Sequence, residues 1–127
     1  NEEGGRDWGR DITAGRGYFR RNLTLIAAAC RQAGAEPVFL TQPALRDRLG
    51  EGAFQAKVAA DFTRYNQSIL ETAAELQALA IDVDAATPQE PALFIDAVHQ
   101  TPEGVRRFTE TLYPPLAEAL RRRESRR

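Results

Sequence analysis

The sequence predicts an α/β fold of the doubly wound type, in which helices cover a parallel sheet. Two observations predict it. Apolar residues recur at helical spacing in long segments, and these segments alternate with short, continuous apolar runs that suit buried strands. The chain has 127 residues, 43% hydrophobic and 28% charged, which is typical of one small globular domain with a core. Its strands are too few to make a sheet alone, so we expect residues 1–127 to be the C-terminal portion of one domain whose N-terminal strands lie outside this chain.

The first element that the sequence predicts is a helix that starts near Phe19. Residues 1–17 carry five glycines among charges and have no apolar period, so they are predicted to be a loop. Gly34 supplies the stop of the helix. The apolar stripe expected to face the core consists of Phe19, Leu23, Ile26, Cys30 and Ala33.

Two strands and a second helix follow. Val38-Phe39-Leu40 is a continuous apolar run bounded by prolines, as expected of a strand covered on both faces. A second, shorter strand is predicted around Ile81 and Val83. The helix between them starts near Phe54, and its expected inward stripe is Val58, Phe62, Tyr65, Ile69, Ala73 and Leu76.

The last third of the chain predicts a loop and a terminal helix. A brief apolar run, residues 92–95, leads into the loop. Thr101 is placed to cap the helix, with Pro102 at its first position. Pro114 and Pro115 are expected to interrupt the helix. Residues 121–127, "RRRESRR", form a basic tail that suits a solvated helix end. The inward stripe expected for this helix is Val105, Phe108 and Leu112.

Composition bears on several classes of function. The net charge of −1 gives no overall field that favours nucleic acid or an acidic membrane. Cys30 is the only cysteine, so neither an intrachain disulfide nor a thiolate metal cluster is expected. No apolar run approaches the roughly 20 residues of a membrane helix. The sequence contains no methionine, so we expect "NEEGG" to follow an upstream segment and the chain to be a piece of a longer protein.

The residues most suggestive of chemistry are Asp96 and His99, in the stretch "FIDAVHQTPEG". His99 is the only histidine, and Asp96 lies three residues before it, between an apolar run and a capped helix. This position in the chain predicts that Asp96 and His99 lie at the carboxyl edge of the sheet, where open α/β folds bind their ligands. The alternative interpretation is a surface turn in which Asp96 accepts local hydrogen bonds.

Three stretches give the sequence a resemblance to a known family. They are "FIDAVHQTPEGVRRFTETLYPPL", "YFRRNLTLIAAACRQAGAEPVFLTQP" and "RYNQSILETAAELQALAIDVDAA". The first resembles the last conserved block of the SGNH hydrolases, also called GDSL-type esterases and lipases, and the other two are similar to helix-strand units of bacterial members. The resemblance covers roughly residues 18 to 122. It implies a three-layer αβα flavodoxin-like sandwich with a parallel sheet and a carboxylic ester hydrolase of the serine type.

The resemblance also implies roles for individual residues. His99 would be the general base and Asp96 would orient its ring, as the His-Asp part of a Ser-His-Asp triad. Asn1 is the one place at which the family's oxyanion-hole asparagine can be sought. No G-D-S block is present, and Ser68 and Ser125 lack the exposed strand-to-helix setting of a nucleophile. The serine is therefore expected outside this chain, which alone should be inactive.

The implied partner is a small ester, such as an acetylated sugar or a lipid, with no cofactor and no metal. An alternative is a non-catalytic α/β binding or interaction module in which His99 is structural. A second alternative is nucleic-acid binding through residues 121–127, which would depend strongly on salt. Neither the pattern nor the resemblance bears on the oligomeric state or the compartment. Further candidates to line a pocket are Thr41, Gln42, Pro43, Tyr65, Asn66 and Trp8, for each of which packing or an ordinary loop role is the alternative.

Overall fold

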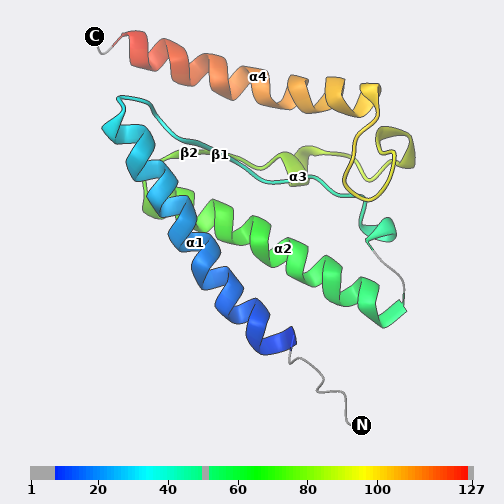
Figure 1. Cartoon of the computed structure of the whole chain (residues 1–127). Helices are drawn as coiled ribbons and strands as arrows, with labels where there is room; N and C mark the ends of the chain where they lie inside the picture. The colour runs from blue at the N-terminus through cyan, green and yellow to red at the C-terminus, as the bar shows by residue number, and fades with distance from the viewer. Residues whose placement is uncertain (1–7, 50–51, 126–127) are drawn as a thin grey trace.

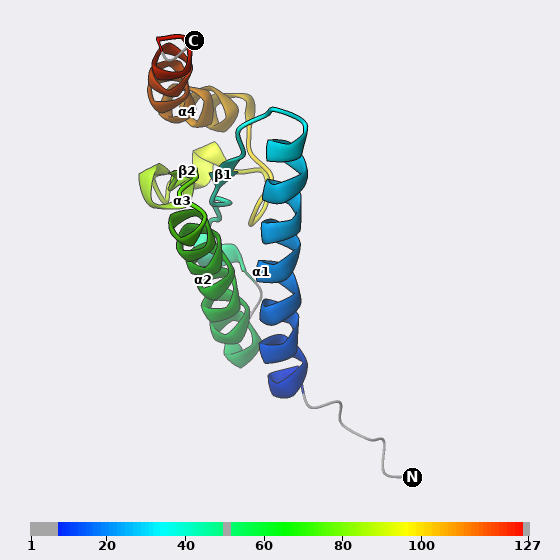
Figure 2. The same cartoon turned by 90° about the vertical axis from the view of Figure 1, so that its left-hand side faces the viewer.

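The fold is a mixed arrangement of long helices around a short pair of strands (Figure 1). The computed structural model describes residues 8–49 and 52–125, with side chains from 15 to 49 and from 56 to 125. In Figures 1 and 2 the strands lie between α4 on one side and α1 and α2 on the other. The predicted alternation of helices and strands is confirmed. The elements are α1 (Trp8–Gln32), β1 (Val38–Leu40), the 3-10 turn η1 (Arg46–Arg48), α2 (Gly52–Glu75), β2 (Leu79–Ile81), α3 (Val83–Ala86), the 3-10 turn η2 (Pro91–Leu93) and α4 (Pro102–Glu124).

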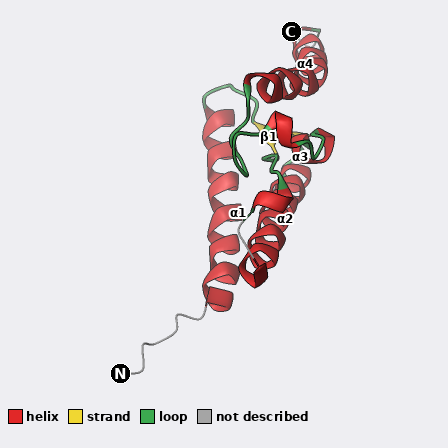
Figure 3. Cartoon of the chain, turned by 90° about the vertical axis from the view of Figure 1, so that its right-hand side faces the viewer, coloured by secondary structure: helices red, strands yellow, loops and turns green. Residues whose placement is uncertain are grey.

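The two strands pair in parallel, as predicted, and α2 is the crossover that a parallel pair requires. Val38 lies opposite Leu79 and Leu40 opposite Ile81. The ladder extends one residue further, because the Thr41 N–H donates to the carbonyl of Ile81 at 3.2 Å. Both strands therefore end at the same edge of the sheet, and the loops that follow them are joined there by the Thr41–Asp82 hydrogen bond. Figure 3 shows β1 in yellow among the loops, which are drawn in green.

The core beneath the strands joins α1, β1 and α2. Its fully packed members are Ala27, Phe39 and Ala73, one from each element, and Leu23 and Ile69 pack against them. Phe39 is buried at the centre of this cluster, and burial of such a side chain contributes roughly 1.5–3 kcal/mol. This cluster fixes the two helices beneath the strand pair.

The predicted loop over residues 1–17 is wrong from Trp8 onward, where α1 already begins. Residues 1–7 lie outside the described part of the chain. Gly15 lies where a Cβ atom would be 3.0 Å from the Tyr65 hydroxyl, so this glycine lets α1 and α2 approach closely. Arg16 also donates from Nε to Ser68 Oγ on α2 at 3.3 Å. Packing between the helices thus outweighs the roughly 1 kcal/mol that glycine costs a helix.

Three predicted inward positions, Ile26, Ala33 and Val105, are wrong, because their side chains are exposed. Ile26 is 56% exposed and Val105 is 52% exposed. On α1 the buried position is the neighbouring Ala27, whose small side chain lets the helix lie close to Phe39. The inward face of α1 therefore includes Phe19 and Leu23, as predicted, and Ala27 in place of Ile26.

The ends of the last two elements also differ from expectation. Val83 is not in the second strand, because Asp82 accepts a hydrogen bond from the Ala85 N–H at 3.1 Å and caps α3 there. Pro114 and Pro115 lie within α4 and do not interrupt it. They remove two helical N–H donors, but residues 116–124 are good helix formers and continue the helix. The basic tail forms the end of α4, as predicted, through Glu124.

Candidate functional site

The segment from Phe94 to Gln100 folds into a closed turn. Phe94 and Gln100 form an antiparallel bridge, and the Ile95 N–H donates to the His99 carbonyl at 2.7 Å. At the tip, the Ala97 carbonyl accepts from the Leu45 N–H at 2.8 Å. The turn is thus tied across its base and held at its tip by the loop that follows β1.

Asp96 uses both carboxylate oxygens inside this turn. Its Oδ1 accepts from the N–H groups of His99 at 2.8 Å and Val98 at 2.9 Å. Its Oδ2 lies 2.6 Å from His99 Nδ1. The His99 and Val98 backbone donors, followed by the His99 side chain, hold the pKa of Asp96 well below its usual range. The carboxylate is therefore ionised at neutral pH.

His99 receives a fixed ring orientation from this carboxylate. An ionised carboxylate can only accept, so Nδ1 carries the proton of the neutral ring and Nε2 keeps a lone pair. The side chain is 74% exposed, and no side chain that the structure describes bonds to Nε2. The arrangement can take a proton at Nε2 from a group that approaches from solvent.

The turn lies at the carboxyl end of the strand pair, as the sequence predicts. Leu45, which donates to it, comes shortly after β1, and Leu45 packs with Leu93 and Phe94 in a second apolar cluster. In Figure 1 the yellow loop before α4 runs beside the segment that leads from β1 to η1. The cluster and the hydrogen bond together attach the turn to the sheet.

The start of α4 fixes the other end of the turn. Thr101 caps the helix as predicted, because its Oγ1 accepts from the Gly104 N–H at 3.2 Å. The same hydroxyl donates to the Ala92 carbonyl at 2.9 Å, and the Thr101 N–H donates to the Leu93 carbonyl at 3.0 Å. Gly104 is buried against that Leu93 carbonyl. The capping residue is therefore also hydrogen-bonded to the segment that leads into the turn.

The other predicted site residues are not brought to this turn. Asn1 lies outside the described residues. Ser68 is buried within α2 and donates to the Arg64 carbonyl at 2.8 Å, while Ser125 ends α4 and donates to the Arg122 carbonyl at 3.0 Å. Neither serine has the setting of a nucleophile.

Three of the pocket candidates near β1, Gln42, Tyr65 and Asn66, line a hollow of about 360 Å³, as predicted, and Tyr65, Asn66 and Thr41 also have structural roles. Asn66 is buried and holds the backbone of Gln42, accepting from its N–H at 3.0 Å and donating to its carbonyl at 2.8 Å. Tyr65 packs edge-on against Phe19, with ring centroids 5.0 Å apart. Thr41 is buried and donates to Asp82 Oδ1 at 2.8 Å, which joins the ends of the two strands.

Sequence reasoning missed Asp84, a buried carboxylate at the carboxyl end of β2. Its Oδ1 accepts from the Ala44 N–H at 3.3 Å, and Oδ2 pairs with the Arg46 guanidinium. The signal was the pair of aspartates in "IDVD" directly after an apolar run, at the edge where ligands and loops meet.

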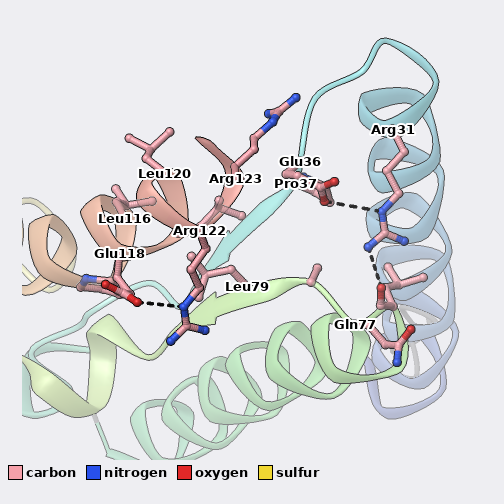
Figure 4. Close-up of a pocket in the computed structure, with 15 residues that line it drawn as sticks. Arg31, Glu36, Pro37, Gln77, Leu79, Leu116, Glu118, Leu120, Arg122 and Arg123 are labelled. Atoms are coloured by element: carbon pink, nitrogen blue, oxygen red, sulfur yellow. Dashed lines mark hydrogen bonds and ion pairs between the residues drawn. The ribbon is translucent and has the colours of Figure 1, made fainter. Parts of the chain in front are cut away.

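Hollows elsewhere on the molecule lie apart from the turn. One of about 970 Å³ is lined by the starts of β1 and β2 and by the far end of α4, with Arg31, Glu118 and Arg122 on its rim (Figure 4). Arg122 pairs there with Glu118, and Arg31 donates to the Leu76 carbonyl. The α4 residues that line this hollow, from Pro115 to Arg123, lie about 20 to 30 Å along the helix from its start at the turn. This hollow is therefore too far from Asp96 and His99 to be part of the same site.

The described residues bring no three potential metal ligands together, so the turn has no partner carboxylates for a metal ion. No helix within the described ranges has the length and apolar character needed to span a membrane. Comparisons with protein-family models, curated proteins and solved structures found no match to this chain.

Protonation of Asp96 should open the turn, but only at a pH well below 3.8. The pKa of Asp96 is lower in the folded chain than its ordinary value of 3.8, so its carboxylate stabilises the turn above that pH. The contribution falls as the pH drops below 3.8 toward the folded value, and it is gone once the carboxyl is protonated in both states. We expect NMR signals of the Val98 and His99 amides to shift below pH 3.8. Asp96→Asn is the control, in which the two amide signals should no longer move with pH in this range. Signals that move equally in the parent and in Asp96→Asn would contradict an ionised Asp96.

Proposed function

We propose that the chain is the His-Asp portion of a serine-type carboxylic ester hydrolase of the SGNH kind. The observation that carries the proposal is the 2.6 Å contact between Asp96 Oδ2 and His99 Nδ1, beside an exposed imidazole at the carboxyl end of parallel strands. In this proposal the nucleophilic serine lies outside the 127 residues. The substrate is a small ester, such as an acetylated sugar or a lipid.

The chemistry assigns a distinct task to each nitrogen of the ring. Nε2 takes the proton of the serine hydroxyl as the serine oxygen attacks the ester carbonyl, and the imidazolium that forms is stabilised by Asp96. The ring then gives this proton to the departing alcohol as the ester C–O bond breaks, which leaves an acyl-enzyme. Water, activated by the same nitrogen, releases the acid in the second half of the cycle.

The strand pair supports the finer fold prediction, a three-layer flavodoxin-like sandwich. A two-stranded parallel sheet is smaller than parallel sheets usually are. In the proposal, further strands join the edge of β1 that faces away from β2. The serine would then end a strand at the same carboxyl edge as the turn.

A structural role for His99 is the competing interpretation. Asp96 has such a role in any case, since its Oδ1 closes the turn through two backbone donors. The imidazole adds one further bond and is 74% exposed, so packing gives no reason for a histidine here. This contrast favours a catalytic role for the ring over a structural one.

Nucleic-acid binding through the basic tail receives less support. Arg121 and Arg122 pair with Glu118, and Arg123 donates to the Gly34 carbonyl. These arginines are therefore engaged locally at the end of α4.

Labelling by a fluorophosphonate tests the proposed function directly. We expect the full-length protein to be labelled at a serine encoded upstream of Asn1, because only a serine activated by a base reacts quickly. Ser68→Ala and Ser125→Ala are matched controls, and labelling should persist in both. An upstream sequence without such a serine, or a full-length protein that resists labelling, would reject the hydrolase and favour a binding module.

A further inference from the structure

The loop between β1 and η1 offers its backbone donors alternately to two sides. Leu45 is extended, with φ −82° and ψ 99°, so neighbouring N–H groups point in opposite directions. The N–H groups of Ala44 and Arg46 donate to Asp84 Oδ1 at 3.3 Å and Gln89 Oε1 at 3.0 Å. The Leu45 N–H between them donates to the Ala97 carbonyl at 2.8 Å. Two side chains thus fix the direction of the donor that holds the turn.

Asp84 is well placed to act as the fixed point. Its side chain is 8% exposed and pairs with the Arg46 guanidinium, so its negative charge is compensated where it is buried. Its own N–H donates to Thr41 Oγ1 at 2.9 Å, which ties it to the end of β1. Gln89 reinforces the arrangement, because its Nε2 donates to the Ala44 carbonyl at 2.9 Å.

The Asp96–His99 turn depends on this support because its own side chains are exposed. Asp96 and His99 are 55% and 74% exposed, so packing does not hold them. Besides the Leu45 hydrogen bond, Leu45 packs against Leu93 and Phe94, and Arg48 of η1 adds longer contacts from Nη1 to the carbonyls of Phe94 at 3.5 Å and Ile95 at 3.4 Å. A catalytic ring that moves by about 1 Å loses much of its effect, so the loop matters to the site.

We propose that Asp84 and Gln89 are positioning residues for His99, acting through the backbone of Ala44, Leu45 and Arg46. The proposal rests on the proposed function, in which His99 is the base. It assigns a role at the site to residues that never touch the substrate. Loss of either side chain frees the Leu45 donor to turn away from Ala97, and the imidazole then loses its fixed place.

The single histidine makes this testable on the chain itself by ¹⁵N NMR of the imidazole, without any activity assay. In the parent chain at a pH where the ring is neutral, we expect the Nδ1–H tautomer that Asp96 selects. Asp84→Ala and Gln89→Ala should raise the Nε2–H population at least twofold, and should speed hydrogen exchange of the Leu45 amide roughly tenfold or more. Asp84→Asn keeps an acceptor for Ala44 and should show a smaller effect.

Arg20→Met is the matched control. It removes an ion pair with Glu71 and Glu75 between α1 and α2, and it should leave both readouts unchanged. If Asp84→Ala fails to fold by circular dichroism, Gln89→Ala decides the question, because Gln89 is exposed.

Two results would separate the possible failures. Folded Asp84→Ala or Gln89→Ala chains with the parental tautomer and parental Leu45 exchange would overturn the positioning role, provided that Asp96→Ala does change the tautomer. If Asp96→Ala also leaves the tautomer population of His99 unchanged, the Asp96–His99 pair is not formed. Both this proposal and the proposed function would then be wrong.

Discussion

In the proposed hydrolase, replacing His99 with alanine is expected to lower kcat for a small aryl ester by on the order of 10⁴- to 10⁶-fold. Without Nε2, the described turn has no good base for a serine hydroxyl, because the two backbone N–H groups that remain bonded to Asp96 Oδ1 keep the pKa of this carboxyl low and make it a weak base. KM should change little, since the ring does not hold the neutral ester. Steady-state hydrolysis measured near neutral pH gives both constants.

Two further variants separate a base from a structural residue at this position. His99→Gln keeps a donor for Asp96 but cannot take up a proton, so it should be as inactive as His99→Ala. Asp96→Asn should lower kcat by about 10⁴-fold, because the ring then loses the partner that selects its tautomer. Val105→Ala, at an exposed position in the first turns of α4, should keep full activity. Near-parental turnover in either His99 variant would remove the ring from the mechanism.

The turn and its helix cap were predictable because their causes are local. Asp96 folds back onto a ring three residues later, and Thr101 caps the helix that begins at Pro102, so short-range spacing is sufficient. The buried character of Phe39 was equally readable from the apolar run around it. The turn and the cap join residues that are close in sequence, whereas Phe39 was predicted from its own apolar run although Ala27 and Ala73, which bury it, are distant in the sequence.

The parts that sequence reasoning missed depend on distant partners. From the sequence alone, Gly15 predicts a break in the helix. Its role depends on the close approach of Tyr65, which is fifty residues later in the chain. Asp84 reads as a polar residue that weakens a strand, and only the approach of Ala44 and Arg46 explains its burial. A single sequence contains no sign of such pairings, because the pattern of one helix or strand does not name the element that covers it.

The second large effect is expected at Gly104, in the first turn of α4. A Cβ atom there would lie 2.1 Å from the Leu93 carbonyl oxygen and 3.0 Å from Gln100 Cβ. The closer atom is a backbone carbonyl oxygen that also accepts the Thr101 N–H. It therefore cannot move aside as the end of a flexible side chain could. We expect Gly104→Ala to destabilise the chain by roughly 1–3 kcal/mol, the usual cost of overpacking. The gain in helix propensity, about 1 kcal/mol, offsets only part of that overlap.

Gly17→Ala supplies the matched comparison, because the substitution is the same and the surroundings differ. A Cβ atom on Gly17, in the interior of α1, would meet nothing within 4 Å. That variant should therefore be more stable than the parent by roughly 0.5–1 kcal/mol. Urea unfolding of both variants measures the difference, and equal shifts in the same direction would contradict the close packing at Gly104. Because Leu93 and Gln100 flank the Asp96–His99 turn, Gly104→Ala should also loosen the His99 ring, whereas Gly17→Ala should leave it in place.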